Sequence, residues 1–371
     1  MNVASDLSAT VAPTYEQARE RFLNAARLAD ASVETFDHPL SGPAGEPLAL
    51  DVAVVGSREP TTTVIVVSAT HGVEGFAGSA LQSHWLQRLA QAPLPGSDLR
   101  LACVHGLNPY GFAWHRRVNE DNVDLNRNFV DWSPAADRPV NPGYGQLAEL
   151  LVPREWEEET ISVTTDALLA EAEANGFDWL QEAVSSGQYQ HPKGLFYGGD
   201  RPVWSHKWLR RHLPAIAGPA SRVVVIDLHT GLGPWGFGEL LHSGSSAEPA
   251  FQRANQWWKG EVRSITEGES VSAVLAGEWL SVADELVGTG AEVTAVAIEY
   301  GTVDTVTVLQ ALRADAWLHG YGDPGSAQAS EIVAQMRAAF CDDDPAWLAE
   351  LITRFDQVVD DAIVGLGYPL A

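Results

Sequence analysis

The feature that most constrains this chain is a pair of apolar, β-branched runs that each end in a histidine and a glycine turn. The first run covers residues 64–70 and leads into His71 and Glu74, and the second covers residues 222–228 and leads into His229. Apolar and polar residues do not alternate in these runs, which is typical of strands covered on both faces. We therefore expect two buried strands that carry these side chains at their carboxyl ends.

Further strands and helices alternate with these runs along the chain. Strands are predicted at residues 46–55, 99–105 and 295–302, and helices at residues 14–28, 77–90, 306–319, 327–340 and 346–364. Such an alternation indicates an α/β sheet with crossover helices, and the last three helices are expected to pack on this sheet. Ligands of such sheets bind beyond the carboxyl ends of the strands.

His71 and Glu74 are residue types that bind zinc, because imidazole and carboxylate are two thirds of a His₂Glu catalytic site. A His-x-x-Glu pair also arises by chance, and a lone histidine after a strand, such as His229, is more often a hydrogen-bonded core residue. Asp227 either orients a ligand or caps the loop. Glu299 ends another apolar strand, and a buried carboxylate without a partner is costly, so it needs a partner or a function.

A polar segment at residues 108–129 contains several arginines and asparagines between apolar residues. One alternative is a surface loop in which the arginines pair with neighbouring acidic residues. The other is an anion pocket, because a planar guanidinium can hold a carboxylate through two parallel hydrogen bonds. The residue types alone leave both alternatives open.

Four motifs in order resemble the zinc metallocarboxypeptidase superfamily, which also contains the succinylglutamate desuccinylases and aspartoacylases. They are HGVEG at residue 71, NPYGF at residue 108, RRVNEDNVDLNRNF at residue 116 and DLHT at residue 227. The resemblance spans residues 46–319 and is strongest to an uncharacterised bacterial branch described only as a domain of unknown function. It implies a mixed, mostly parallel twisted sheet flanked by helices, with zinc at its carboxyl edge.

The resemblance also implies a ligand set and an activity. One zinc ion per chain would be bound by His71, Glu74 and His229, and Glu299 matches the general base. The implied reaction is the zinc-dependent hydrolysis of an amide bond next to a free carboxylate, in a peptide or in an N-acyl amino acid. A non-catalytic protein that binds a metal or a partner with the same fold is the alternative.

The resemblance assigns further residues in the polar segment. Arg117 matches the arginine that polarises the scissile carbonyl, with Arg116 as the competing candidate, and the spacing to the DLNRNF motif favours Arg117. Asn126 and Arg127 match the pair that grips the substrate carboxylate. Asp124 matches the aspartate behind the first histidine, where a carboxylate fixes the tautomer of the ring and makes it a stronger ligand.

The compact members of this superfamily lack an obvious counterpart of residues 130–213. Prolines and tryptophans cluster here before two helical patterns at residues 153–175 and 179–185. We expect an insertion folded onto a single catalytic domain, residues 1–371, where it walls or covers the site; a surface decoration without substrate contact is the alternative. A later stretch, residues 231–238, is too rich in glycine to be regular and is expected near the substrate.

Composition limits the partners of this chain. Its 49 acidic and 23 basic residues give a formal net charge of −26, which repels phosphate backbones and anionic membranes. Nucleic acid and membranes are therefore not expected as partners. The small-molecule or peptide substrate with a free carboxylate is what the resemblance implies. Two distant cysteines and an N-terminus without a leader pattern favour reduced thiols and a cytoplasmic location.

Overall fold

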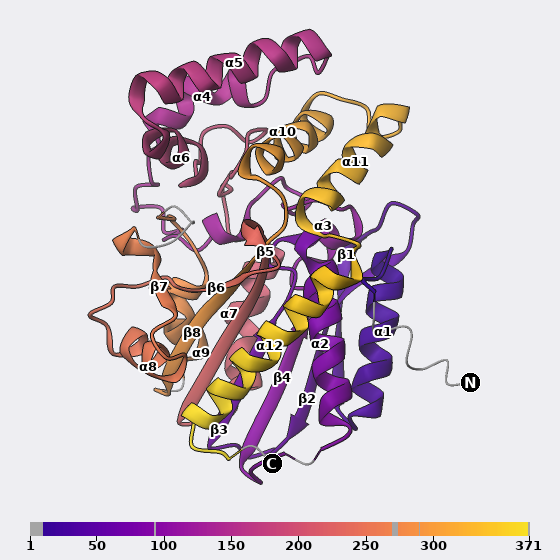
Figure 1. The fold of residues 1–371 in the computed structure, drawn as a ribbon, viewed down its shortest axis with the longest axis vertical. Coiled ribbons are helices and arrows are strands. Elements are labelled where there is room, and N and C mark those ends of the chain that lie inside the picture. The colour runs from indigo at the N-terminus through magenta and orange to yellow at the C-terminus, as the bar shows by residue number, and fades with distance from the viewer. Residues whose placement is uncertain (1–9, 93, 269–273, 289, 370–371) are drawn as a thin grey trace.

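Within residues 10–92, 94–268, 274–288 and 290–369, which this computed structural model describes, eight strands form one mixed sheet (Figure 1). Its strand order is β1-β2-β4-β3-β5-β8-β6-β7. The strands are β1 (Ser32–Ser41), β2 (Pro47–Gly56), β3 (Thr62–Val67), β4 (Leu99–His105), β5 (Arg222–Trp235), β6 (Gly238–His242), β7 (Val262–Ser264) and β8 (Glu292–Gly301). The central strands β4, β3, β5 and β8 are parallel, whereas β1, β2 and β6 form antiparallel pairs. The predicted mixed, mostly parallel sheet is confirmed.

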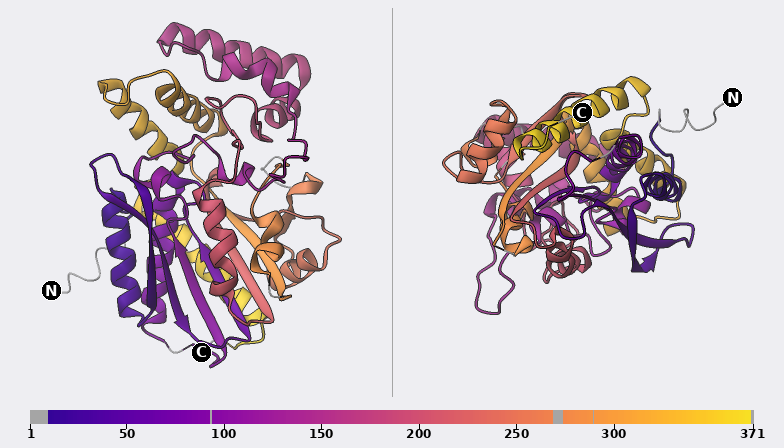
Figure 2. Two further views of the ribbon diagram at one scale, coloured as in Figure 1. Left: turned by 180° about the vertical axis from the view of Figure 1, so that it is seen from behind. Right: turned by 90° about the horizontal axis from the view of Figure 1, so that it is seen from below.

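The chain order reverses at the centre of the sheet, between β3 and β5. Helix α2 (Gly75–Leu89) connects β3 to β4 over one face, and α7 (Trp204–Ala217), which precedes β5, covers the other face (Figures 1 and 2). At such a reversal the connections leave in opposite directions, and a crevice for a ligand forms at the carboxyl ends of the two strands. His71, just after β3, and His229, in β5, lie at this reversal.

Helices cover both faces of the sheet. One face carries α1 (Tyr15–Leu28), α2, α8 (Pro249–Trp257) and α12 (Pro345–Gly365), and the other carries α7 and α9 (Ala283–Val287). In β3, Val64 and Val66 pack into the first of these cores, and Ile65 and Val67 pack into the second. A strand buried on both faces needs an unbroken apolar run, which explains why β3 could be predicted.

The part of the segment at residues 130–213 that precedes α7 rises above the carboxyl edge of the sheet (Figure 1). It forms α4 (Pro142–Leu151), α5 (Glu158–Asn175) and α6 (Phe177–Ser185), which share an apolar core with α10 (Thr305–Gly320) and α11 (Ala327–Phe340). Arg313 of α10 is fully buried and donates to the carbonyls of Leu150 (2.8 Å) and Leu151 (3.0 Å) at the end of α4. The last part of the segment, α7, belongs to the sheet layers, and the single-domain organisation stays a prediction.

Two expectations about elements hold only in part. Of the three C-terminal helices, α12 packs in the core on one face of the sheet. Helices α10 and α11 contact β5, but most of their apolar side chains share a core with the helices of the insertion. The glycine-rich stretch is part of β5, which continues to Trp235. Pairing with β8 holds up to Gly231 and returns at Trp235, so the residues between them bulge out of the ladder. The short helix α3 (Pro109–Ala113) and the edge strand β1 were not predicted.

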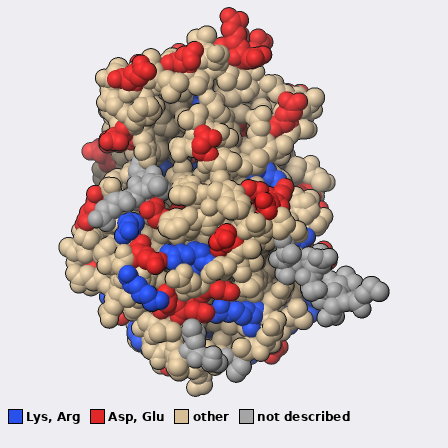
Figure 3. Space-filling model, viewed as in Figure 1, with Lys and Arg blue, Asp and Glu red and all other residues tan. Residues whose placement is uncertain are grey.

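Charged side chains are distributed unevenly over the surface. Acidic side chains lie over the upper helices in Figure 3, whereas both signs of charge mix lower on the same face. Ion pairs join α2 and α12 there, as between Arg88 and Asp356 (2.9 Å). Among the described residues, none of the helices combines the length and the apolar character that crossing a membrane requires.

Candidate metal centre

A tight turn after β3 positions Glu74. This turn, η2 (Gly72–Glu74), is a 3₁₀ helix with His71 as its N-terminal cap residue. Its backbone is fastened to the polar segment, because Gly72 N donates to Arg117 O (3.0 Å). A Cβ atom at Gly72 would lie 2.0 Å from the backbone of α3, so only glycine fits at this position. His71 and Glu74 are therefore held within one turn of each other.

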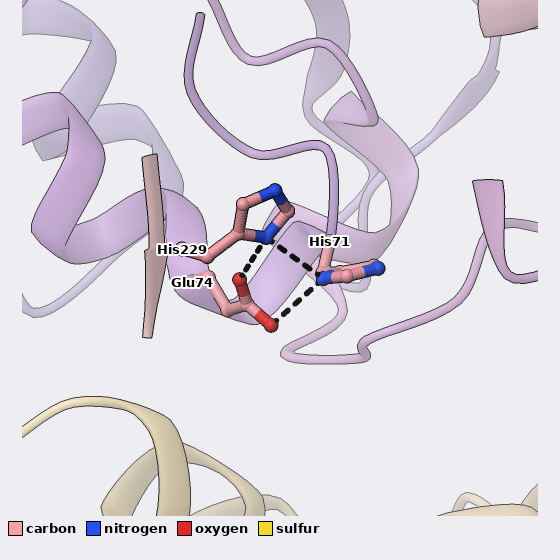
Figure 4. A group of neighbouring side chains, drawn as sticks. All are labelled: His71, Glu74 and His229. Carbon is pink, nitrogen blue, oxygen red and sulfur yellow. Dashed lines mark hydrogen bonds and ion pairs between the residues drawn. The ribbon is translucent and has the colours of Figure 1, made fainter. Parts of the chain in front are cut away.

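Three side chains, His71, Glu74 and His229, converge at the carboxyl edge of the sheet (Figure 4). The Nδ1 atoms of His71 and His229 lie 2.9 and 3.0 Å from the two carboxylate oxygens of Glu74 and 3.2 Å from each other. At zinc–ligand distances of about 2.0–2.1 Å, two ligand atoms of a tetrahedral site lie about 3.3–3.4 Å apart. The donor atoms are thus spaced nearly as zinc requires, and two imidazoles with one carboxylate are the ligand set of a catalytic site.

A buried aspartate lies behind each histidine. His71 Nε2 is 3.2 Å from Asp124 Oδ1, and His229 Nε2 is 2.7 Å from Asp227 Oδ2. Both aspartates have no exposed surface. When His229 Nε2 carries the ring proton and donates it to Asp227, the Nδ1 lone pair faces the centre of the cluster, as in a metal ligand. His71 Nε2 also lies 2.9 Å from Arg117 Nη2, which can only donate. The structure therefore places both predicted aspartates beside the predicted ligands.

Negative charge dominates the cluster. Burial opposes ionisation of Glu74, but the neighbouring histidines outweigh it and hold the pKa of Glu74 below its usual value. Burial also opposes protonation of His229, yet Asp227 and Glu74 hold the pKa of His229 well above its usual value. Buried carboxylates that raise the proton affinity of an imidazole also attract a metal cation. The charge of the site therefore suits a divalent metal.

Two adjacent arginines have different partners. Arg117 donates from Nε to Asp124 Oδ2 and from Nη1 to Glu74 Oε1, both at 3.0 Å. Arg116 forms a buried ion pair with Asp315 of α10, with Nε 3.2 Å from Oδ1 and Nη2 3.0 Å from Oδ2. Arg117 therefore reaches the candidate metal ligands, whereas Arg116 fastens the polar segment to α10.

Glu299 lies in β8, directly opposite His229 of β5 in the sheet register. Residues paired in this way point to the same face of a sheet, so the Glu299 carboxylate is on the side of the cluster. Its Oε1 accepts a hydrogen bond from Leu232 N (3.0 Å), in the bulge of β5. Burial, aided by the negative charge of Glu74, raises the pKa of Glu299 to about 7. Such a carboxyl group can accept and release a proton near neutral pH.

Asn126 and Arg127 lie in η3 (Leu125–Arg127), with only 3% and 2% of their surface exposed. Arg127 Nε and Nη2 both donate to the carbonyl of Ser185, at 3.1 and 2.5 Å, and Nη1 donates to Asn126 O (3.0 Å). The Nε–Nη2 edge that can hold a carboxylate is therefore occupied by a backbone carbonyl at the end of α6.

The comparison with protein families decides where this chain belongs. A family model described as "Protein of unknown function (DUF2817)" matches residues 12–354, which is most of the chain. The chain belongs to this family. No curated protein matches the sequence.

Several solved structures are similar to this DUF2817 protein in fold. Carboxypeptidase A from Helicoverpa armigera is 12% identical with a TM-score of 0.45, and the match covers 90% of this chain and 75% of that one. Bovine thrombin-activatable fibrinolysis inhibitor, in complex with tick carboxypeptidase inhibitor, is 12% identical with a TM-score of 0.41 and coverages of 90% and 97%. A succinylglutamate desuccinylase from Silicibacter sp. TM1040 is 14% identical with a TM-score of 0.38 and coverages of 79% and 67%. Because these TM-scores are below 0.5, the assignment of the site rests on the side chains of the DUF2817 protein itself.

Sequence reasoning missed two side chains at the site. Trp279 has no exposed surface, and its Nε1 donates to Asp227 Oδ2 (2.8 Å). Phe196 has a φ of +50°, which is strained for a bulky residue, and the Cζ atoms of Arg117 and Arg127 lie 5.5 and 5.3 Å from the centre of its ring. Neither side chain belongs to a recognisable motif, and both come from irregular segments, so no periodicity pointed to them.

Proposed function

We propose that this chain is a zinc-dependent hydrolase that cleaves an amide bond next to a free carboxylate. The observation that carries the proposal is the arrangement of the two nitrogens on each histidine. In both His71 and His229, Nδ1 faces Glu74. His229 Nε2 faces the buried Asp227, and His71 Nε2 faces the buried Asp124 and Arg117 Nη2. Catalytic zinc sites use three protein ligands, whereas structural sites use four, and the ligand set here matches the catalytic type.

The other residues of the cluster have complementary functions in this proposal. Zinc at this site would lower the pKa of a bound water and polarise the substrate carbonyl. Glu299, whose pKa is about 7, would accept the proton of the attacking water and donate it to the leaving amine. Arg117 would donate hydrogen bonds to the carbonyl oxygen as negative charge develops on it.

We assign the substrate carboxylate to Arg127 and Asn126. A chain with a net charge of −26 repels anions in general, so an anionic substrate needs a local, bidentate contact. The carboxylate would take over the hydrogen bonds that Arg127 now donates to Ser185 O. The insertion reaches this arginine and leaves 2% of it exposed, which favours a small N-acyl amino acid or dipeptide over an extended peptide.

Elemental analysis of the purified protein tests the metal. We expect about one zinc per chain, and His71→Ala and His229→Ala should each lose it while the circular dichroism spectrum stays native. His84→Ala is the matched control, because His84 pairs with Asp356 on the surface and should keep the metal. Full zinc content in both ligand variants would overturn the proposal.

A substrate screen tests the chemistry. Dipeptides and N-acyl amino acids should be compared with the same compounds carrying an amidated carboxyl group. We expect turnover of the free carboxylates and little turnover of the amides. A protein that binds zinc but hydrolyses neither series would favour the non-catalytic alternative, and equal turnover of both would remove the function assigned to Arg127.

A further inference from the structure

We propose that Trp279 is a positioning residue of the metal centre, which acts through Asp227 on the ligand His229. The inference rests on the proposed metal site and extends it beyond the aspartates. The Trp279 indole is fully buried, and its Nε1 donates to Asp227 Oδ2 at 2.8 Å. The same oxygen lies 2.7 Å from His229 Nε2, so the indole and the imidazole share one acceptor.

The two aspartates behind the histidines are supported in different ways. Asp124 has cationic neighbours, with Arg117 at 3.0 Å and Arg127 at 3.9 Å. In the described part of the chain, Asp227 forms an ion pair only with His229, and its further donors are neutral. Thr70 Oγ1 lies 2.8 and 2.9 Å from its two oxygens, and Trp279 supplies the remaining N–H.

The neutral donors determine how well Asp227 can orient His229. A buried carboxylate stays ionised and in one orientation only when donors satisfy its oxygens. Without the indole N–H, Oδ2 would keep only the ring of His229 and a share of the single Thr70 hydroxyl proton, which also faces Oδ1. The aspartate could then rotate about its side chain, and the direction of the His229 Nδ1 lone pair would no longer be fixed. Loss of such an outer partner typically weakens metal binding about 10–100-fold.

The backbone around Trp279 also contacts the proposed carboxylate-binding segment. Gly277 O accepts a hydrogen bond from Phe129 N (3.0 Å), and a Cβ atom at Gly277 would lie 2.6 Å from Arg127 O. Gly277 has a φ of +88°, so it combines a left-handed conformation with this close approach. The loop that carries Trp279 is therefore fastened to the segment that carries Arg127, which limits the movement of the indole.

A pair of tryptophan variants tests this inference. Trp279→Phe removes the N–H but keeps an aromatic ring. Trp258→Phe is the matched control, because Trp258 is also buried and donates to a single acceptor, Val358 O (2.9 Å), but packs in the core on the other face of the sheet. Zinc affinity is measured by competition with a chelator, and the geometry of the site is followed by the visible spectrum of the cobalt-substituted protein.

We expect Trp279→Phe to weaken zinc binding about 10–100-fold and to change the cobalt spectrum, with Trp258→Phe within about twofold of wild type. Unchanged affinity and spectrum in Trp279→Phe, or equal losses in both variants, would overturn the inference. If Trp279→Phe does not fold, replacing Trp279 by 3-benzothienylalanine keeps the bicyclic shape and exchanges the N–H for sulfur. A wild type without zinc would instead refute the proposed function itself.

Discussion

The carboxyl edge of the sheet and the insertion above it build the candidate site in different ways. At the sheet edge, side chains on strands or directly after them make the contacts. His229 and Glu299 are partners in the β5–β8 ladder, and Glu74 follows β3 by one short turn. The insertion contributes mainly backbone, since the carbonyl of Ser185 accepts from Arg127 and the carbonyl of Tyr197 accepts from Asp124 N. It also contributes the ring of Phe196, over which Arg117 and Arg127 lie.

Under the proposed function, this difference separates the residues of the reaction from those that bind the substrate. Strands buried on both faces hold side chains in one geometry, which a metal site and a general base require. Segments that connect such elements carry binding functions more often, because they tolerate changes of length and sequence. Substitutions at the sheet edge should therefore change metal binding or turnover, whereas substitutions in the insertion should change the substrate affinity.

Of the substitutions that test this difference, Glu299→Gln should lower turnover the most. The amide keeps the shape of the side chain and can still accept from Leu232 N, but it cannot act as a general base. We expect kcat to fall by roughly 10²–10⁴, with zinc content and melting temperature unchanged. Loss of zinc in this variant would make Glu299 a metal ligand.

The neighbouring arginines provide the next test, because they lie side by side in sequence. Arg117→Met should lower kcat by about 10²–10³, which corresponds to the loss of an oxyanion donor. Arg116→Met should mainly lower the free energy of unfolding, by about 3–5 kcal/mol, because it removes the arginine from the buried carboxylate of Asp315. Replacing Asp315 by leucine in the same chain should restore most of this stability.

Chemical denaturation and steady-state kinetics on the folded protein separate these two outcomes. If Arg116→Met lowers kcat as much as Arg117→Met does, the two arginines do not have separate functions. The assignment of Arg116 to stability and of Arg117 to catalysis would then be wrong.

The strands that could be predicted are those buried on both faces of the sheet, because such burial requires an unbroken run of apolar residues. The unbroken apolar runs of β3, β4, β5 and β8 identified the buried strands. The histidines and the glutamate near their ends, together with the family resemblance, pointed to the proposed ligands. Strand β1 was missed because it is an edge strand with a largely exposed side-chain pattern and a proline at position 39. Pairing with β2 imposes its conformation, and such pairing has no local signal.

The contacts that Ser185 and Trp279 make at the site could not be predicted, for a different physical reason. Ser185 contacts Arg127 through its carbonyl, a group that every residue has, so the identity of the side chain says nothing about the contact. Trp279 contacts Asp227 from a loop 52 residues further along the chain. The chain has 13 tryptophans, and nothing in the sequence indicates which of them contacts an aspartate. Contacts of this kind follow from the packing of the whole chain.

Arg127→Lys should have a smaller effect, limited to recognition. Lysine keeps the positive charge but cannot offer two parallel donors to a carboxylate. We expect KM for a free carboxylate to rise roughly 10–100-fold, in line with about 1.5–3 kcal/mol for hydrogen bonds to a charged group, with kcat nearly unchanged. The amidated form of the same substrate is the control and should show little change. Equal effects on both forms would mean that Arg127 only holds the insertion in place.

The smallest effect is expected at Asn141, which joins two helices of the insertion. Its Oδ1 accepts from Tyr144 N as the cap of α4, and its Nδ2 donates to the carbonyls of Ala183 and Gly187, both at 3.0 Å, on either side of Ser185. Asn141→Ser keeps a good cap but removes these donors, at a cost of about 1 kcal/mol. Amide hydrogen exchange at residues 183–188 should then become faster.

If the insertion forms a wall of the substrate pocket, the looser loop of Asn141→Ser should raise KM about fivefold and leave kcat unchanged, because binding must then order the loop. Thr14→Ala, which removes the cap of α1 on the flank of the sheet, is the control for a similar loss of stability and should leave KM unchanged. A lower KM in Asn141→Ser would give the opposite conclusion. Ser185 O would then be a competitor that the substrate carboxylate must displace from Arg127, and the insertion would inhibit binding rather than support it.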